Sequence, residues 1–317
     1  MSVPSLLLRV TQIVQETPSI RVFELTDPQG RALPAFSAGA HIDVHVPGGP
    51  IRQYSLWNSP TETHRYMIAV LNVASGRGGS RAMHRDIRVG QTLEVSGPRN
   101  HFPLSMGASR YLFLAGGIGV TPILAMIDTV RPADKDFSLV YCTRSPQDTP
   151  FRELLSGLPG RVRLHHDGGD PSRSLDIATL LSDHEAGTEL YCYGPRRFMD
   201  AVRTATARWP AGTVHFEDFS PPAPVDPDAD QAFTVEIAST GDRYEVPPEK
   251  TILEVLREAG MVCDSSCEAG LCGVCCVSYN EGTVIHRDSV LMEDERAGQL
   301  AICCSRAAAG SVLKLDL

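Results

Sequence analysis

The sequence lacks any run of about 18 consecutive apolar residues, the length that a membrane-spanning helix needs. Its first stretch, MSVPSLLLRVTQIV, has no basic start, and Arg9 interrupts it before the apolar region of a signal peptide is complete. We therefore expect a cytoplasmic protein that does not associate with a membrane.

Positive charge is also scarce, because 29 Lys and Arg stand against 38 Asp and Glu, which gives a net charge of −9. A nucleic-acid-binding protein normally presents a basic face, so we expect no nucleic-acid partner. The deficit is uneven: residues 231–317 carry 14 acidic and 7 basic side chains, a net charge of −7, which leaves −2 for residues 1–230. An acidic surface in the C-terminal part would steer a basic partner toward it. The acids that could form this surface are Asp264, Glu268, Glu293, Asp294 and Glu295.

Length and composition indicate a globular protein of several domains. Apolar residues make up 42% of the chain and charged residues 21%, as is typical of soluble globular proteins. At roughly 100–200 residues per domain, 317 residues correspond to two or three domains, and the texture of the sequence favours three.

The first two domains differ in their pattern. Residues 1–105 contain short alternating runs, such as HIDVHV, between Gly and Pro turns, which predicts an antiparallel β-barrel or sandwich, of which we expect the barrel. Residues 106–221 alternate between strand and helix, since YLFLAG reads as a buried strand, PILAMIDTV as a helix and FSLVYCT as the next strand. This order predicts an α/β domain with a parallel sheet and crossover helices.

A linker and a small domain complete the chain. Residues 222–231 are rich in Pro and Asp and have no periodicity, so we interpret them as a linker. In residues 232–317, FTVEIA and RYEVPP alternate like a hairpin, TILEVLREAG has an amphipathic pattern, and a cysteine-rich loop follows. We expect a compact α+β domain here.

The cysteine spacing carries the most specific chemical signal. Cys267, Cys272 and Cys275 form a C-x4-C-x2-C run, and Cys303 follows 27 residues beyond its last member. This is the plant-type spacing for a [2Fe–2S] cluster, in which four thiolates hold two irons. The alternatives are reduced structural thiols or a zinc site, although zinc sites usually show paired C-x2-C units. The fourth ligand is either Cys303 or its neighbour Cys304, because only one of two adjacent side chains of an extended segment points inward.

Two stretches of the first domain suit a flavin. Arg52, Tyr54 and Ser55 stand at the end of a predicted strand and offer a cation, an aromatic face and a hydroxyl within four residues. The run SGRGGSRAMH at 75–84 places glycines before a helix start, which can form an anion cradle of backbone N–H groups. Its candidate phosphate-binding residues are Gly78, Gly79 and Ser80. A polar strand end and a flexible loop are the alternatives.

Two further turns suit a dinucleotide. LAGGIGVTPILAM is a strand, a Gly-rich turn and a helix, although it does not match the G-x-G-x-x-G pattern. YCYGPRRFMD repeats the order of strand, turn and helix. Ligands of open parallel sheets bind at the carboxyl edge of the strands. The candidate nucleotide-binding residues are Gly116, Gly117, Gly119, Thr121, Gly194 and Pro195.

Taken in order, R-x-Y-S, G-R-G-G-S, AGGIGVTP, Y-G-P and C-x4-C-x2-C resemble the phthalate dioxygenase reductase and vanillate demethylase reductase family of the ferredoxin–NADP reductase superfamily. The likeness covers essentially the whole chain and includes strings such as VHFEDF and HRDSVL. It implies a flavin barrel, a nicotinamide domain and a ferredoxin-like β-grasp domain. It also implies FMN, NADH as electron donor, and a separate oxygenase, usually a Rieske non-haem iron enzyme that acts on an aromatic compound.

The resemblance also implies roles for individual residues. It places Arg52, Tyr54 and Ser55 at the flavin, with Ser55 near the ring, and Gly79 and Ser80 at its phosphate. In addition it places Gly117, Thr121, Gly194 and Pro195 at the dinucleotide. The family's last cluster ligand lies in a C-x-S-R string, which selects Cys303. The family commonly has a Cys where this chain has Tyr193, so Tyr193 is a candidate for shaping the nicotinamide pocket.

Cofactors would carry the redox chemistry, so no side chain is assigned as catalytic. One rival interpretation changes the acceptor to a cytochrome P450 or an independent ferredoxin. Another, from a different class, is a non-enzymatic iron–sulfur redox sensor, which predicts that one nucleotide site is degenerate, whereas both look intact. We expect an enzyme that acts as a monomer.

Overall fold

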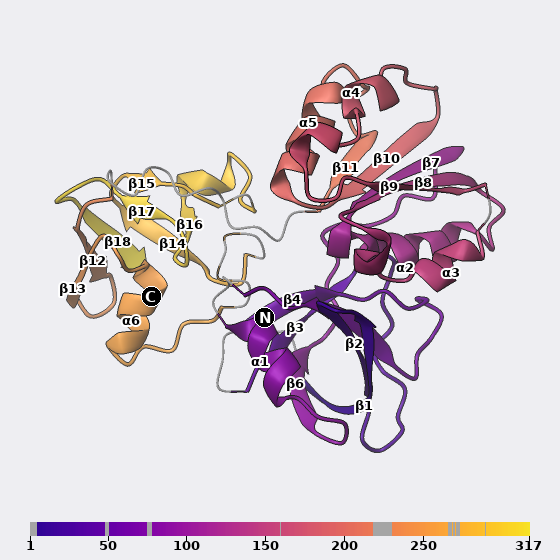
Figure 1. The fold of residues 1–317 in the computed structure, drawn as a ribbon. Helices are drawn as coiled ribbons and strands as arrows, with labels where there is room; N and C mark the ends of the chain where they lie inside the picture. Colours follow the sequence, from indigo (N-terminus) through magenta and orange to yellow (C-terminus); the bar gives the residue numbers. More distant parts are fainter. Residues whose placement is uncertain are drawn as a thin grey trace. The chain divides into compact units, whose positions relative to one another are not determined.

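The computed structural model describes residues 5–47, 51–74, 78–158, 160–217, 230–265, 268, 270, 273–288 and 290–317. Contacts within the chain divide it into two compact units, Met1–Asp218 and Phe219–Leu317. Each unit contains two of the sheets drawn in Figure 1. Within the described ranges, no helix has both the length and the apolar character required to cross a membrane.

The N-terminal part of the first unit is a six-stranded antiparallel sheet that curls into a barrel, with the strand order β4-β3-β6-β1-β2-β5 (Figure 1). Its elements are β1 (Ser5–Thr17), β2 (Ile20–Thr26), β3 (His41–His45), β4 (Ile51–Ser55), β5 (Tyr66–Leu71), α1 (Gly79–Asp86) and β6 (Thr92–Ser96). Alternate side chains of these strands, such as Leu8 and Val10 of β1, fill the interior of the barrel. The predicted antiparallel barrel is confirmed.

The second part of the first unit is a five-stranded parallel sheet with the order β11-β10-β7-β8-β9. Its strands are β7 (Arg110–Gly116), β8 (Asp136–Thr143), β9 (Val162–His166), β10 (Thr188–Tyr193) and β11 (Val214–Phe216). Its helices are α2 (Val120–Val130), α3 (Arg152–Ser156), α4 (Ile177–Leu180) and α5 (Arg196–Ala205). The chain builds outward from β7 through β8 to β9 and then returns to β10 on the other side of β7. The switch point for ligand binding therefore lies between the carboxyl ends of β7 and β10.

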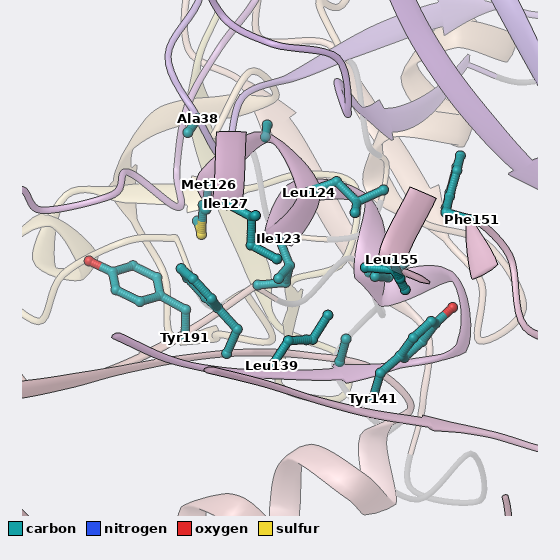
Figure 2. Close-up of a cluster of buried hydrophobic side chains, with 14 of the residues drawn as sticks. Ala38, Ile123, Leu124, Met126, Ile127, Leu139, Tyr141, Phe151, Leu155 and Tyr191 are labelled. Carbon is teal, nitrogen blue, oxygen red and sulfur yellow. The ribbon is translucent and has the colours of Figure 1, made fainter. Parts of the chain in front are cut away.

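Helix α2 is apolar and buried over most of its length, with Asp128 and Thr129 as its partly exposed residues. Figure 2 shows its side chains Ile123 and Met126 beside Leu139 and Tyr191 of the parallel sheet. The same buried cluster includes barrel residues such as Ala38. Each large aliphatic side chain buried in this way contributes about 1.5–3 kcal/mol. The barrel and the parallel sheet thus share one core, which explains why they form a single compact unit.

The second unit is a mixed sheet with the order β13-β12-β18-β14-β16, a two-stranded sheet β15-β17, one α-helix and one short 3-10 helix (Glu295–Ala297) among its described residues. Its elements are β12 (Phe233–Ile237), β13 (Arg243–Val246), α6 (Ile252–Glu258), β14 (Cys276–Glu281), β15 (Val284–Ile285), β16 (Gln299–Ala301), β17 (Arg306–Ala307) and β18 (Val312–Asp316). Thr251 and Glu254 form a capping box that starts α6, and Ile252 and Leu256 pack it on the sheet. The predicted hairpin and amphipathic helix are both confirmed.

Candidate functional site

Strand β4 carries the three residues predicted to meet a flavin. Tyr54 and Ser55 pair with Ile42 and His41 of β3, which fixes the end of the strand. The hydroxyl of Tyr54 is buried and has no hydrogen-bond partner in the described part of the chain. Burial raises the pKa of Tyr54 further above its ordinary value, so the hydroxyl remains a donor at neutral pH. An orphaned buried donor fits a site whose partner is a ligand.

The start of α1 lies against the same strand. Gly78 adopts a left-handed conformation (φ 91°) before the helix, and no side chain caps the helix or places an acid in its first turn. The stem of Arg52 covers Gly79 so closely that a β-carbon there would lie 2.9 Å from Arg52 Cγ. Ser80 Oγ accepts a hydrogen bond from Val73 N–H (3.1 Å). A guanidinium beside uncapped helix N–H groups fits a phosphate.

The turns after β7 and β10 pack directly on each other. A β-carbon at Gly119 would lie 2.3 Å from the carbonyl oxygen of Tyr193, and one at Gly116 would lie 2.6 Å from Pro195 Cδ. A β-carbon at Gly194 would be 3.0 Å from Gly116 Cα. We predicted these glycines for the close approach of a dinucleotide. Here, three of them are required for contact between the two turns, which brings both turns to the switch point.

Gly117 differs from its neighbours in the turn. Its φ is +54°, and a β-carbon would meet nothing within 4 Å. Tyr141 Oη donates to the carbonyl oxygen of Gly117 (2.9 Å), and Thr121 Oγ1 donates to that of Ile118 (3.0 Å). Thr121 is buried, so in this structure its hydroxyl supports the turn. Gly117 is therefore the position in the turn that has open space for a ligand.

Sequence reasoning missed Glu217, which follows β11 at the same carboxyl edge. Its backbone N–H donates to the carbonyl oxygen of Cys192 (3.3 Å), next to Tyr193. The side chain is buried, and neither carboxylate oxygen has a hydrogen-bond partner among the described residues. Burial raises the pKa of Glu217 well above its ordinary value. The available signal was a carboxylate directly after a short strand of a parallel sheet.

The structure describes only part of the cysteine-rich loop that contains Cys267, Cys272 and Cys275. Cys267 and Cys272, the first two predicted ligands, lie outside the described residues. Cys275 and Cys303 are buried, and their thiols are hydrogen-bonded to each other. The thiol of Cys275 lowers the pKa of Cys303, but the thiol of Cys304 and burial raise it to about 12. Two buried thiols that converge from separate segments supply half of the four thiolates that a [2Fe–2S] cluster needs.

Cys304 lies differently from its neighbour. It is half-buried, and its thiol faces the carbonyl oxygen of Ala301 (3.8 Å). A β-carbon at Gly270, whose φ is +71°, would lie 2.7 Å from Cys304 Sγ. Cys304 therefore also contacts the cysteine-rich loop, but Cys303 is the more buried of the two, which favours it as the inward member of the pair.

Comparison with known proteins matches both ends of the chain to family models. Residues 7–103 match the oxidoreductase FAD-binding domain, and residues 235–308 match the 2Fe-2S iron-sulfur cluster binding domain. The chain is 45% identical to the phthalate 4,5-dioxygenase oxygenase reductase subunit of Pseudomonas putida, over 98% of this chain and 96% of that protein. It is 43% identical to the phthalate dioxygenase reductase of Burkholderia cepacia, over 93% and 92%. The chain belongs to the phthalate dioxygenase reductase family.

The structural matches agree with this assignment. A solved phthalate dioxygenase reductase, described as a modular structure for electron transfer from pyridine nucleotides to [2Fe-2S], has a TM-score of 0.82 at 42% identity and covers 99% of this chain and 98% of its own. An intact type IV self-sufficient cytochrome P450 monooxygenase matches 99% of this chain with 41% of its own length (TM-score 0.81, 40% identity). The predicted family, fold class and oxidoreductase activity are thus confirmed.

Proposed function

We propose that this protein is an NADH-dependent reductase component, in which electrons pass from NADH through FMN to a [2Fe–2S] cluster and then to a separate terminal oxygenase. The observation that carries the proposal is the convergence of the buried thiols of Cys275 and Cys303 in a chain that also holds a flavin-type barrel and a nucleotide switch point. The four proposed ligands are Cys267, Cys272, Cys275 and Cys303.

The role of the chain's own residues is to bind and orient the flavin and the dinucleotide. Arg52 and the N–H groups that open α1 at Gly79 would neutralise the flavin phosphate, and the buried hydroxyl of Tyr54 would donate a hydrogen bond to the flavin. Ser55 lies at the end of β4 and would face the flavin ring. Gly117 admits the dinucleotide at the start of α2. A bound flavin accepts two electrons and releases them one at a time, which matches a nicotinamide donor to a one-electron cluster.

FMN is favoured over FAD by the resemblance to this family, although the matching model is named for FAD. The described barrel offers one phosphate cradle, formed by Arg52 and α1, which suffices for FMN. Acid extraction and mass measurement should yield about one FMN per chain, with about two irons and two acid-labile sulfides, as expected for a [2Fe–2S] protein. Extraction of FAD would overturn the choice of flavin, and zinc in place of iron would overturn the cluster.

NADH is favoured over NADPH on the same grounds. An NADPH site needs a cation on the 2′-phosphate, and Arg144, exposed at the end of β8, offers one candidate. Arg196 and Arg197 open α5 and are the others. The resemblance decides for NADH, and a kcat/KM at least tenfold higher for NADH than for NADPH is the expected result. Comparable values for the two donors would contradict it.

We infer a separate oxygenase as acceptor because several relatives are named as reductase subunits, including one of carnitine monooxygenase in Escherichia coli (strain K12; 38% identical over 98% of both chains). A Rieske oxygenase that acts on an aromatic compound is the proposed type. The second candidate is a cytochrome P450, which the match to the self-sufficient monooxygenase favours. Single-turnover reduction of a purified Rieske oxygenase and of a P450 by the NADH-reduced protein should proceed at least tenfold faster for the first. The opposite order would select the second candidate.

We further propose a cytoplasmic monomer in which residues 1–105 form the flavin domain, 106–221 the nucleotide domain, 222–231 the linker and 232–317 the cluster domain. Sedimentation of the holoprotein at the 34.4 kDa of one chain is the expected result. A value twice as large would overturn the monomer.

A further inference from the structure

Asp288 is a fully buried carboxylate in the second unit. Its side chain is 0% exposed. Oδ2 accepts a hydrogen bond from Leu291 N–H (3.0 Å), and Oδ1 lies 3.5 Å from Ser305 Oγ and 3.4 Å from His286 Nδ1. Asp288 therefore joins its own loop to the segment that contains Cys303. Burial of a carboxylate is costly unless such partners satisfy it.

Arg296 fixes the backbone of the same residue. Its Nη2 donates to the main-chain carbonyl oxygen of Asp288 (2.8 Å) and lies 3.7 Å from Oδ2. The carbonyl oxygen of Arg296 lies in turn 3.2 Å from His286 Nε2. The carboxylate and the main chain of Asp288 are thus held by His286, which precedes it in the sequence, and by Leu291 and Arg296, which follow it. The position of its α-carbon is strongly determined.

Gly270 of the cysteine loop rests against that α-carbon. A β-carbon at Gly270 would lie 2.9 Å from Asp288 Cα and 3.2 Å from Asp288 Cβ, so the two main chains are in direct contact. The backbone N–H of Gly270 is hydrogen-bonded to the thiol of Cys303. The N–H group that approaches a proposed ligand therefore belongs to a residue that also rests on the main chain of Asp288, with Cys304 Sγ (2.7 Å from the same β-carbon position) as its other neighbour.

We propose that Asp288 is a positioning residue of the cluster site, which holds the backbone N–H of Gly270 against the sulfur of Cys303 by fixing the surface on which Gly270 rests. This inference rests on the proposed cluster ligation. Hydrogen bonds from N–H groups to the sulfurs of an iron–sulfur cluster help to set its reduction potential. Asp288 then tunes the potential through the position of Gly270.

The test compares Asp288→Ala with Asp288→Asn in the full-length holoprotein. Redox titration followed by EPR should show a midpoint potential for Asp288→Ala that is more negative than that of the wild type, with shifted g values, because the N–H···S bond is weakened. Asp288→Asn retains an oxygen that accepts from Leu291 N–H and should stay close to the wild type. Glu245→Gln, which removes one exposed charge from the same unit, is the matched control and should leave both quantities unchanged.

Two results would overturn the proposal. If Asp288→Ala lowers the melting temperature but leaves the potential and the g values unchanged, Asp288 only stabilises the fold. If Asp288→Asn shifts the potential as much as Asp288→Ala does, the charge acts directly and the position of Gly270 is irrelevant.

A milder variant applies if Asp288→Ala fails to retain its cluster. Arg296→Gln loosens the main chain of Asp288 and should shift the potential in the same direction by a smaller amount; no shift would overturn the proposal. A wild-type protein without a [2Fe–2S] cluster would refute the proposed function itself. Unchanged variants of a wild type that holds a cluster would refute only the role of Asp288.

Discussion

Gly119→Ala is the most direct test of how the two nucleotide turns are built. A β-carbon at this position would lie 2.3 Å from the carbonyl oxygen and 2.6 Å from the carbonyl carbon of Tyr193. Real β-carbons do not approach other heavy atoms more closely than 3.0 Å, so the turns must separate by about 0.7 Å, the difference between 3.0 and 2.3 Å. The contacted atoms are main chain and cannot rotate away. Such overpacking costs about 1–3 kcal/mol of the free energy of unfolding.

The same displacement should affect the proposed hydride donor more than the fold. A misplacement of about 1 Å between reacting groups can cost about 100-fold in rate. We therefore expect Gly119→Ala to lower kcat/KM for NADH by about 10- to 100-fold, while the flavin content stays at the wild-type level because the barrel is not touched. Stopped-flow reduction of the flavin by NADH measures this rate directly.

Gly107→Ala is the matched control, because its β-carbon would meet only Ser105 Oγ, at 3.6 Å. It should behave as the wild type in both stability and rate. The reasoning is refuted if Gly119→Ala is folded and flavin-loaded and yet is reduced by NADH within twofold of the wild-type rate.

Three further predictions follow from the described residues. Because burial raises the pKa of Glu217, its contribution to stability is complete below its ordinary pKa, near 4.5, and is lost as the pH rises through the raised value. At pH 8, Glu217→Gln should therefore be about 1–3 kcal/mol more stable than the wild type, whereas at pH 4.5 the two should be equally stable. Thermal unfolding of the apoprotein measures this difference, and an equal difference at both pH values would contradict the prediction. Cys303→Ser should abolish the EPR signal of the reduced cluster and Cys304→Ser should preserve it, since only Cys303 is buried beside Cys275; the reverse would move the ligand by one position. Raising the salt from about 0.1 M to about 1 M shortens the Debye length from about 10 Å to about 3 Å, so electron transfer to the oxygenase should slow while NADH reduction of the flavin changes little. Equal sensitivity of the two steps would argue against an acidic docking surface.

The structure sharpens the last of these predictions. Of the acids proposed for docking, Glu268 forms an ion pair with Arg257 (2.7 Å) and is partly shielded. The others remain exposed: Asp264, Glu293, Asp294 and Glu295. Met292, which is 70% exposed, directly precedes Glu293, Asp294 and Glu295 in the chain. Reversal of Glu293 and Asp294 to Lys should therefore slow reduction of the oxygenase more than reversal of Glu268.

The sequence predicted elements whose residues are buried or patterned and missed those that are not. The buried runs YLFLAG and FSLVYCT became β7 and β8, and TILEVLREAG became α6. The edge strands β9 (VRLHH) and β11 (VHF) were not anticipated, because none of their residues is fully buried and neither has an apolar run. An edge strand is solvated on one side and loses the periodicity from which strands are recognised.

The site residues also differ in how far the sequence alone could predict their roles. Cys267, Cys272 and Cys275 can be proposed as ligands because their spacing is a local property of the sequence, whereas the choice of Cys303 over Cys304 rests on the family resemblance. The tight packing of Gly116 and Gly119 on the turn at Gly194 could not be predicted, since it depends on two segments about 75 residues apart meeting at one sheet edge. Sequence reasoning found these glycines but assigned all of them to dinucleotide binding. The structure separates those that allow chain packing from Gly117, which faces open space.

Buried carboxylates show most clearly what the sequence alone could not reveal, because their meaning depends on their partners. Asp43 is buried against Arg99 (2.5 Å), and Asp288 is satisfied by Leu291 N–H, with Arg296 at 3.7 Å, so both join segments of the fold. Glu217 has no such partner among the described residues, although it is equally enclosed. A protein gains nothing in stability from an unsatisfied buried acid. The cost is understandable at a place where a ligand completes the hydrogen bonds, and Glu217 lies at the carboxyl edge beside Tyr193, where the proposed nicotinamide site is.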